Sequence, residues 1–111
     1  MNVARTLAAL SDDTRREILS LLGERGSLAA GAIAEAFALS KPTISHHLRV
    51  LAEAELVRFE RRGTSLVYTL QSNVLEDAAS ALLALAAKRT PRREGDRRSL
   101  PRSRDAKKAL S

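Results

Sequence analysis

The stretch IAEAFALSKPTISHHLRVL, residues 33–51, decides the fold of this chain. Apolar residues recur at helical spacing in its first part and again in its second, with only residues 38–40 between the two. Ser40 is a strong N-cap residue, and Pro42 falls in the first helical turn, where the missing N–H costs nothing. The stretch therefore predicts two angled helices joined by a tight turn, the second running to about Ala54.

The second of these helices presents a polar face. Steps of about 100° per residue place Ile44, Leu48 and Leu51 on one inward face. The DNA major groove admits one helix, whose short polar or basic side chains reach base edges and phosphates. The candidate DNA contacts here are Lys41, Thr43, Ser45, His46 and Arg49. The alternative is that this face only contacts solvent. His47 lies nearer the inward face, and we expect it to pack half-buried beside the following hairpin.

Two alternating segments, residues 57–62 and 66–70, follow and predict a hairpin around Gly63-Thr64-Ser65. Their alternation predicts that one set of side chains faces the core: Val57, Phe59, Tyr68 and Leu70. The tip carries further candidate DNA contacts, Arg61, Arg62 and Thr64, suited to a minor groove or to phosphates. The alternative is a charged edge that discourages aggregation. A helix-turn-helix followed by a hairpin is a winged helix.

The two ends of the folded region predict self-association. Val3, Leu7 and Leu10 recur at helical spacing, and Ser11-Asp12-Asp13 then caps a second helix. A last helix is expected from Asn73, which is predicted to cap it. Because this last helix is apolar nearly all round, it needs two surfaces to cover it, and one small body offers only one. The predicted dimer interface comprises Val3, Leu7, Leu75, Ala79, Leu82, Leu83 and Ala86.

Charge divides the chain of 111 residues into a domain, residues 1–87, and a basic tail, residues 88–111. The first part has 9 Lys+Arg and 10 Asp+Glu, whereas the second has 10 and 3, a net charge of +7. The tail is rich in Pro, Gly, Ser and charge, so we expect disorder and nonspecific attraction to DNA. No export signal or membrane span is recognisable, which makes the cytoplasm the expected location.

Several kinds of chemistry are not expected. There is no cysteine, and the adjacent His46 and His47 diverge by about 100° on a helix, so we expect no metal site and no cofactor. Without a nucleophile–base pair or a phosphate-binding glycine loop, an enzyme is not expected either.

Three blocks in this order give the chain a family resemblance: ALSDDTRREILSLL at 9–22, IAEAFALSKPTISHHLRVL at 33–51 and ELVRFERRGTSLVYTL at 55–70. The sequence resembles the ArsR/SmtB winged-helix repressors, and more closely their small cysteine-free, autorepressor-like subgroup. The resemblance implies dimers held by the first and last helices. Two features depart from it. Glu55 stands where relatives often have Gly, which predicts a different helix cap, and the Cys-containing motif of the metal sensors is missing.

The sequence thus predicts a mainly α (α+β) winged helix-turn-helix with about five helices, a two-stranded wing and a dimeric state. The function expected first is a repressor that binds a palindromic operator on double-stranded DNA as a homodimer. One alternative is that this chain is the DNA-binding subunit of a two-protein regulator, in which a separate protein senses the effector. In that case the chain could act as an activator. Another is a nonspecific nucleoid-type protein that binds DNA through the tail.

Overall fold

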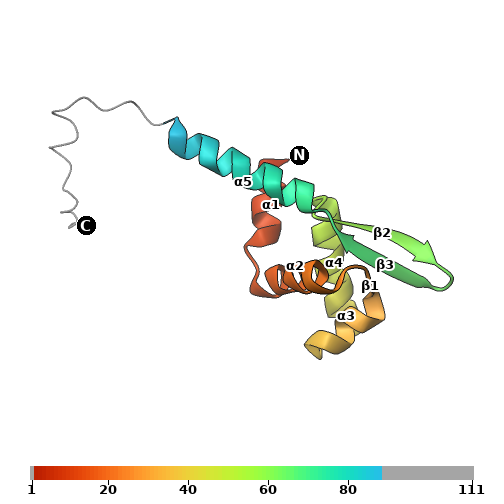
Figure 1. The fold of residues 1–111 in the computed structure, drawn as a ribbon. Coiled ribbons are helices and arrows are strands. Elements are labelled where there is room, and N and C mark those ends of the chain that lie inside the picture. The colour runs from red at the N-terminus through yellow and green to blue at the C-terminus, as the bar shows by residue number, and fades with distance from the viewer. Residues whose placement is uncertain (1, 89–111) are drawn as a thin grey trace, which may run out of the picture.

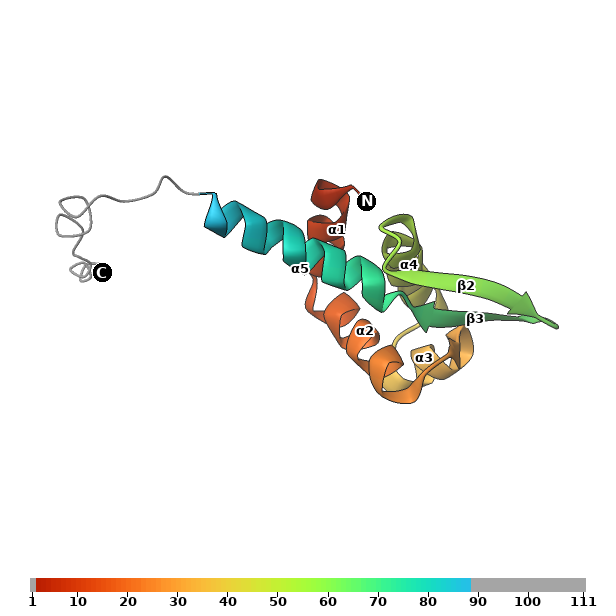
Figure 2. The same ribbon diagram turned by 45° about the horizontal axis from the view of Figure 1, so that its top comes forward.

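The computed structural model describes residues 2–88 and contains five helices and three strands in that range (Figure 1). In chain order these are α1 (Val3–Leu10), α2 (Asp13–Arg25), β1 (Leu28–Ala29), α3 (Ala30–Phe37), α4 (Lys41–Glu53), β2 (Val57–Arg62), β3 (Ser65–Leu70) and α5 (Ser72–Ala87). Helices α1 to α4 form a body, from which the β2–β3 hairpin and α5 project in opposite directions (Figures 1 and 2). The predicted winged helix is confirmed, while all but the first residue of the expected tail lies outside the described residues.

The N-caps predicted from the sequence for α2 and α4 are present in the structure. Asp12 caps α2 by accepting a hydrogen bond from the Arg15 N–H at 3.0 Å, and Ser40 caps α4 with Pro42 in the first turn. The prediction that Asn73 caps the last helix was wrong. The N–H of Gln71 donates to the Leu56 carbonyl at 2.9 Å, and α5 begins directly after this anchored residue, so Asn73 already lies in the first turn.

The sheet has one strand more than the predicted hairpin. Strand β1 pairs antiparallel with β3, Leu28 opposite Tyr68, and the strand order is β1-β3-β2. Two residues are too few to show an alternating pattern, which explains why the sequence did not reveal β1. The hairpin itself agrees with the prediction to within one residue, and its register runs from Val57 opposite Leu70 to Arg62 opposite Ser65.

The core lies where α2, α3 and α4 meet the base of the hairpin. Its largest fully buried apolar side chains are Ile18, Leu22, Ile33, Ile44, Leu48, Leu51 and Leu56. The predicted inward face of α4 is confirmed, because Ile44, Leu48 and Leu51 are each no more than 1% exposed. Burial of large aliphatic side chains from α2, α3 and α4 fixes the angle of α4 within the body.

Phe59 does not belong to this core, contrary to the prediction. Val57 and Tyr68 are buried, but Phe59 is 54% exposed and its ring packs on Tyr68 with centroids 5.5 Å apart. The predicted alternation of side chains along the hairpin is correct, but the predicted burial of Phe59 is wrong. Only the base of the hairpin touches the body, and every β2 residue after Val57 is exposed as the hairpin extends outward (Figure 1).

Glu55 adopts the left-handed backbone conformation that glycine favours, with φ at 64°. The Leu56 N–H donates to the Leu51 carbonyl at 3.0 Å, and the Glu55 N–H donates to the Ala52 carbonyl at 2.9 Å. These two bonds form a Schellman motif. The expectation of a different cap was therefore wrong: the usual cap is kept, because burial of Leu51 and Leu56 offsets the strain of a left-handed non-glycine residue.

Candidate nucleic-acid interface

The polar face of α4 is free to approach a ligand. Lys41, Thr43, Ser45, His46 and Arg49 are all exposed, on the side of the helix away from the core. The hydroxyl of Thr43 lies 2.9 Å from that of Ser40, so it also serves the helix cap. The second helix of the predicted helix-turn-helix thus presents a row of short polar and basic groups on a rigid support, and we call α4 the recognition helix.

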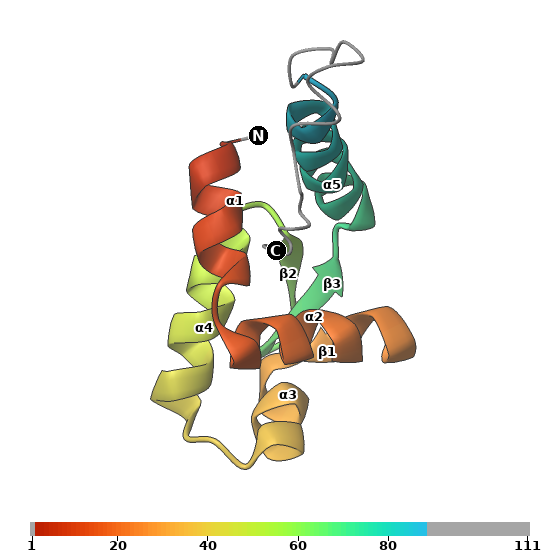
Figure 3. The same ribbon diagram turned by 90° about the vertical axis from the view of Figure 1, so that its left-hand side faces the viewer.

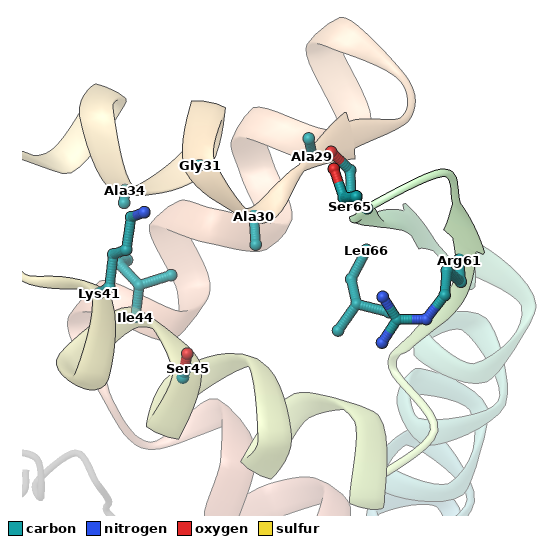
Figure 4. A pocket seen from close by; sticks show the side chains of 11 residues that line it. Ala29, Ala30, Gly31, Ala34, Lys41, Ile44, Ser45, Arg61, Ser65 and Leu66 are labelled. Atoms are coloured by element: carbon teal, nitrogen blue, oxygen red, sulfur yellow. The ribbon is translucent and has the colours of Figure 1, made fainter.

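The two arginines at the wing tip lie on opposite faces of the hairpin. Arg62 Nε donates to Glu60 Oε2 at 2.7 Å, and this bond lowers the pKa of the Glu60 carboxyl. Arg61 pairs across the strands with Leu66 and is directed toward the recognition helix (Figure 4). The sequence-based prediction treated the two as equivalent contacts, although the alternation of side chains along a strand already separates them.

A cleft of about 370 Å³ lies between α3, α4 and the wing (Figure 4). Its floor is apolar, and Lys41 and Arg61 stand on either side of it. The polar groups along its rim are the hydroxyls of Ser45, Thr64 and Ser65. Lys41 and Ser45 of α4 therefore line the same cleft as Arg61 and Thr64 of the wing tip, although the sequence proposed the two pairs separately. The other predicted contacts do not line it: Thr43, His46, Arg49 and Arg62.

His47 is half-buried as predicted, but its neighbours were not predicted. Its imidazole Nδ1 lies 3.3 Å from Arg15 Nη1 and 3.8 Å from Asp12 Oδ2, at the start of α2 rather than beside the hairpin. The 100° turn between successive helical residues carries His47 toward α2, while His46 remains exposed. His47 thus faces away from the exposed surface that carries Arg49 and serves the packing of the recognition helix.

The predicted interface residues lie on α1 and α5, which lie next to each other (Figure 3) and cross at a steep angle (Figure 1). The inner face of α5 carries Val74 and Ala78, both buried, and Leu75 is half-buried. The remaining predicted residues are exposed in the single chain: Val3, Leu7, Ala79, Leu82, Leu83 and Ala86. Leu85, which was not among the predicted residues, is 64% exposed and Leu83 is 70% exposed.

Among residues 2–88, no cluster of three His, Asp or Glu side chains is arranged to hold a metal ion. Within the same range, no helix is both long and apolar enough to cross a membrane.

Comparison with known proteins identifies the family. Residues 10–58 match a family described as "Helix-turn-helix domain". The transcriptional repressor SdpR of Bacillus subtilis is 48% identical over 75 residues, which span 68% of this chain and 82% of SdpR. The chain belongs to the ArsR family. Like its relatives, it is a transcriptional regulator with a winged helix DNA-binding domain, and not an enzyme.

Solved structures of ArsR-like proteins share this fold. An ArsR-like regulator from Rhodococcus matches with a TM-score of 0.69 and 32% identity, covering 98% of this chain and 92% of that one. A homodimeric winged helix-turn-helix DNA-binding domain from Mycobacterium bovis matches with a TM-score of 0.63 and 30% identity, covering 83% and 85%. The arrangement of helices and wing is therefore that of ArsR-like DNA-binding domains.

Proposed function

We propose that this ArsR-family protein is a homodimeric repressor that binds a near-palindromic DNA site through two recognition helices and two wings. The observation that carries the proposal is the pair of exposed surfaces on one small body. One is the polar face of α4 with the wing, and the other is the apolar surface of α1 and α5. The first suits DNA and the second suits a further copy of the chain.

The apolar surface supports a dimer. Leu82, Leu83 and Leu85 are 45%, 70% and 64% exposed, and Val3 and Leu7 on the adjacent α1 are 37% and 39% exposed. At about 100° per residue these three leucines point to different sides of α5, so the helix is apolar over much of its circumference and the single chain leaves it largely uncovered. Full burial of one leucine stabilises an interface by about 1.5–3 kcal/mol. A second copy presents the same surface, so the contact closes with twofold symmetry. The similar domain from Mycobacterium bovis is homodimeric.

A twofold dimer in turn defines the form of the DNA site. Its two recognition helices read two half-sites in opposite orientations, so the site is a near-palindrome. The half-site centres are expected about 10 bp apart, or a multiple of that distance, because both helices must enter the major groove from one side of the duplex. Repression follows where such a site overlaps a promoter and the bound dimer blocks polymerase.

Light scattering tests the dimer. We expect the full-length protein to have twice the monomer mass at micromolar concentration, and Leu83→Glu to have the monomer mass and weaker DNA binding. Leu39→Glu, the same change in the turn between α3 and α4, is the control and should keep the dimer mass. A monomeric unmodified protein, or a Leu83→Glu variant that keeps the dimer mass, would overturn the proposed interface.

Selection from a random pool of duplexes tests sequence-specific binding. The protein is expected to enrich one near-palindromic sequence, and transcription from a promoter overlapping that sequence should fall when the protein is added. Enrichment of no sequence would support the nonspecific alternative. An enriched sequence with increased transcription would support the activator alternative.

A further inference from the structure

We propose that the cleft between α3, α4 and the wing binds one phosphodiester of the DNA backbone, held between Lys41 and Arg61. This inference rests on the DNA-binding function proposed above and adds one defined contact to it. In each protomer this phosphate contact is distinct from the base contact expected of Arg49.

The location of the cleft points to the backbone of the duplex. When the recognition helix lies in the major groove, the wing beside it reaches the adjacent minor groove. One sugar-phosphate strand separates these two grooves, so that strand must pass between the helix and the wing. The cleft is the hollow between these same elements, since Ser45 of α4 and Leu66 of the wing both line it.

The charge of the cleft suits a phosphodiester. Lys41 extends from the start of α4 on one side, and the guanidinium of Arg61 is directed inward from the other (Figure 4). No Asp or Glu is among the described residues that line the cleft. An arginine can hold two phosphate oxygens at once, and a lysine adds a second positive charge, so the two side chains together suit a phosphate of the strand that passes through the cleft.

Two neighbouring sites fit a phosphate less well. A second cleft, nearer the base of the wing, contains Arg49, Glu53, Phe59 and Tyr68, and its carboxylate offsets the charge of its arginine. On the opposite face of the hairpin, Arg62 already donates to Glu60. The first cleft therefore combines two cations with no opposing carboxylate, which is why we assign the phosphate to it.

A methylphosphonate scan tests the assignment. The probe is the duplex that the full-length protein enriches from a random pool, prepared in versions that each carry one neutral methylphosphonate in place of a phosphate. We expect one position in each half-site at which the substitution weakens binding by about tenfold, a typical effect of removing a charge-assisted hydrogen bond. Arg61→Ala and Lys41→Ala should each weaken binding to the unmodified duplex. For either variant, a methylphosphonate at the sensitive position should cause little further loss of affinity.

Arg62→Ala is the matched control, because it removes the same charge one residue away on the other face of the hairpin. For the Arg62→Ala variant, a methylphosphonate at the sensitive position should still weaken binding by the full amount. In addition, Arg61→Ala should lower the slope of log affinity against log salt by about 1 for each contact, hence by about 2 for a dimer.

The inference is wrong if a duplex is enriched but the losses from Arg61→Ala and from methylphosphonate simply add at every position. It is also wrong if Arg62→Ala, and not Arg61→Ala, removes the sensitivity. Failure to enrich any duplex would instead contradict the proposed function, so the two failures are distinguishable. Circular dichroism of each variant shows whether its fold is kept, and Lys41→Ala provides an independent test if Arg61→Ala is altered.

Discussion

The guanidinium of Arg15 lies 3.3 Å from the imidazole Nδ1 of His47, and this contact joins α2 to the recognition helix. The same guanidinium donates from Nε to the Ala9 carbonyl at 2.8 Å and from Nη2 to the Ala8 carbonyl at 3.2 Å. One side chain thus connects the last turn of α1, the first turn of α2 and the middle of α4. Because α1 belongs to the proposed dimer surface, Arg15 links that surface to the orientation of the recognition helix.

Arg15→Ala is expected to lower both stability and DNA affinity. It removes the donor for the partly buried bond to the Ala9 carbonyl, for an exposed bond to the Ala8 carbonyl and for His47, so the free energy of unfolding should fall by about 1–3 kcal/mol. DNA affinity of the protein that remains folded should fall as well, since α4 loses its tie to α1. Thermal denaturation and fluorescence anisotropy measure the two effects. Arg25→Ala, an exposed arginine at the end of α2, should change both by far less; equal effects of the two variants would contradict the linking role.

The cap at Asp12 should make stability depend on pH in the acid range. A hydrogen bond from the Arg15 backbone N–H, opposed by desolvation and aided by the charge of Arg15, lowers the pKa of Asp12 below its ordinary value of 3.8. The folded state therefore favours the carboxylate, and this stabilisation is complete above the ordinary pKa and is lost as the pH falls through the lowered one.

We accordingly expect Asp12→Ala to reduce the free energy of unfolding by about 1 kcal/mol at pH 7, a typical value for an N-cap. The difference from the unmodified protein should shrink as the pH falls below about 4. Denaturant unfolding across this pH range measures it. Asp12→Asn, which keeps an acceptor but does not titrate, should retain most of the cap; a gap for Asp12→Ala that widens in acid would contradict the assignment.

Glu55→Gly is expected to stabilise the protein. The residue adopts φ of 64° at the end of α4, where glycine avoids the steric cost of Cβ, so the gain should be about 0.5–1 kcal/mol. Glu53→Gly, two residues earlier and still within the helix, should destabilise it by a similar amount. Denaturant unfolding of the two variants gives the comparison, and a loss of stability in both would show that Glu55 makes a favourable contact that outweighs its strain.

The sequence predicted most of the fold because its signals are local. Ser40, Pro42 and the apolar spacing of Ile44, Leu48 and Leu51 suffice to define the recognition helix, and Gly63 marks the hairpin turn. The polar face of α4 follows from the same periodicity. These features depend on residues only a few positions apart, so the sequence alone carries them.

What the sequence did not predict depends on contacts between distant segments. Phe59 alternates correctly for a core position, but nothing in its own strand shows that the hairpin extends beyond the body. His47 finds its partners 32 residues away at Arg15, and β1 exists only because Tyr68 and Val67 lie opposite it. The cleft that joins Lys41 to Arg61 likewise requires the packing of α4 against the sheet.

Arg49→Ala and His46→Ala are expected to weaken binding to the enriched duplex with little change in stability. Both side chains are exposed, and removing a base contact at either position should reduce the binding free energy by about 1–3 kcal/mol. Anisotropy titrations on the enriched and a scrambled duplex measure the loss of preference. Arg58→Ala, which removes a charge on the face of the hairpin opposite Arg61, should leave the preference between the two duplexes unchanged. Unchanged preference in Arg49→Ala and His46→Ala would show that these residues do not read bases.

Two copies of this chain are proposed to read two symmetric half-sites through α4 and the wing, and every other DNA contact described above depends on that arrangement. Hydroxyl-radical footprinting of the full-length protein on the enriched duplex tests it most directly. We predict two symmetric sets of protected positions, with centres about 10 bp or a multiple of about 10 bp apart. A single unpaired set of protected positions, or uniform weak protection along the whole duplex, would contradict it.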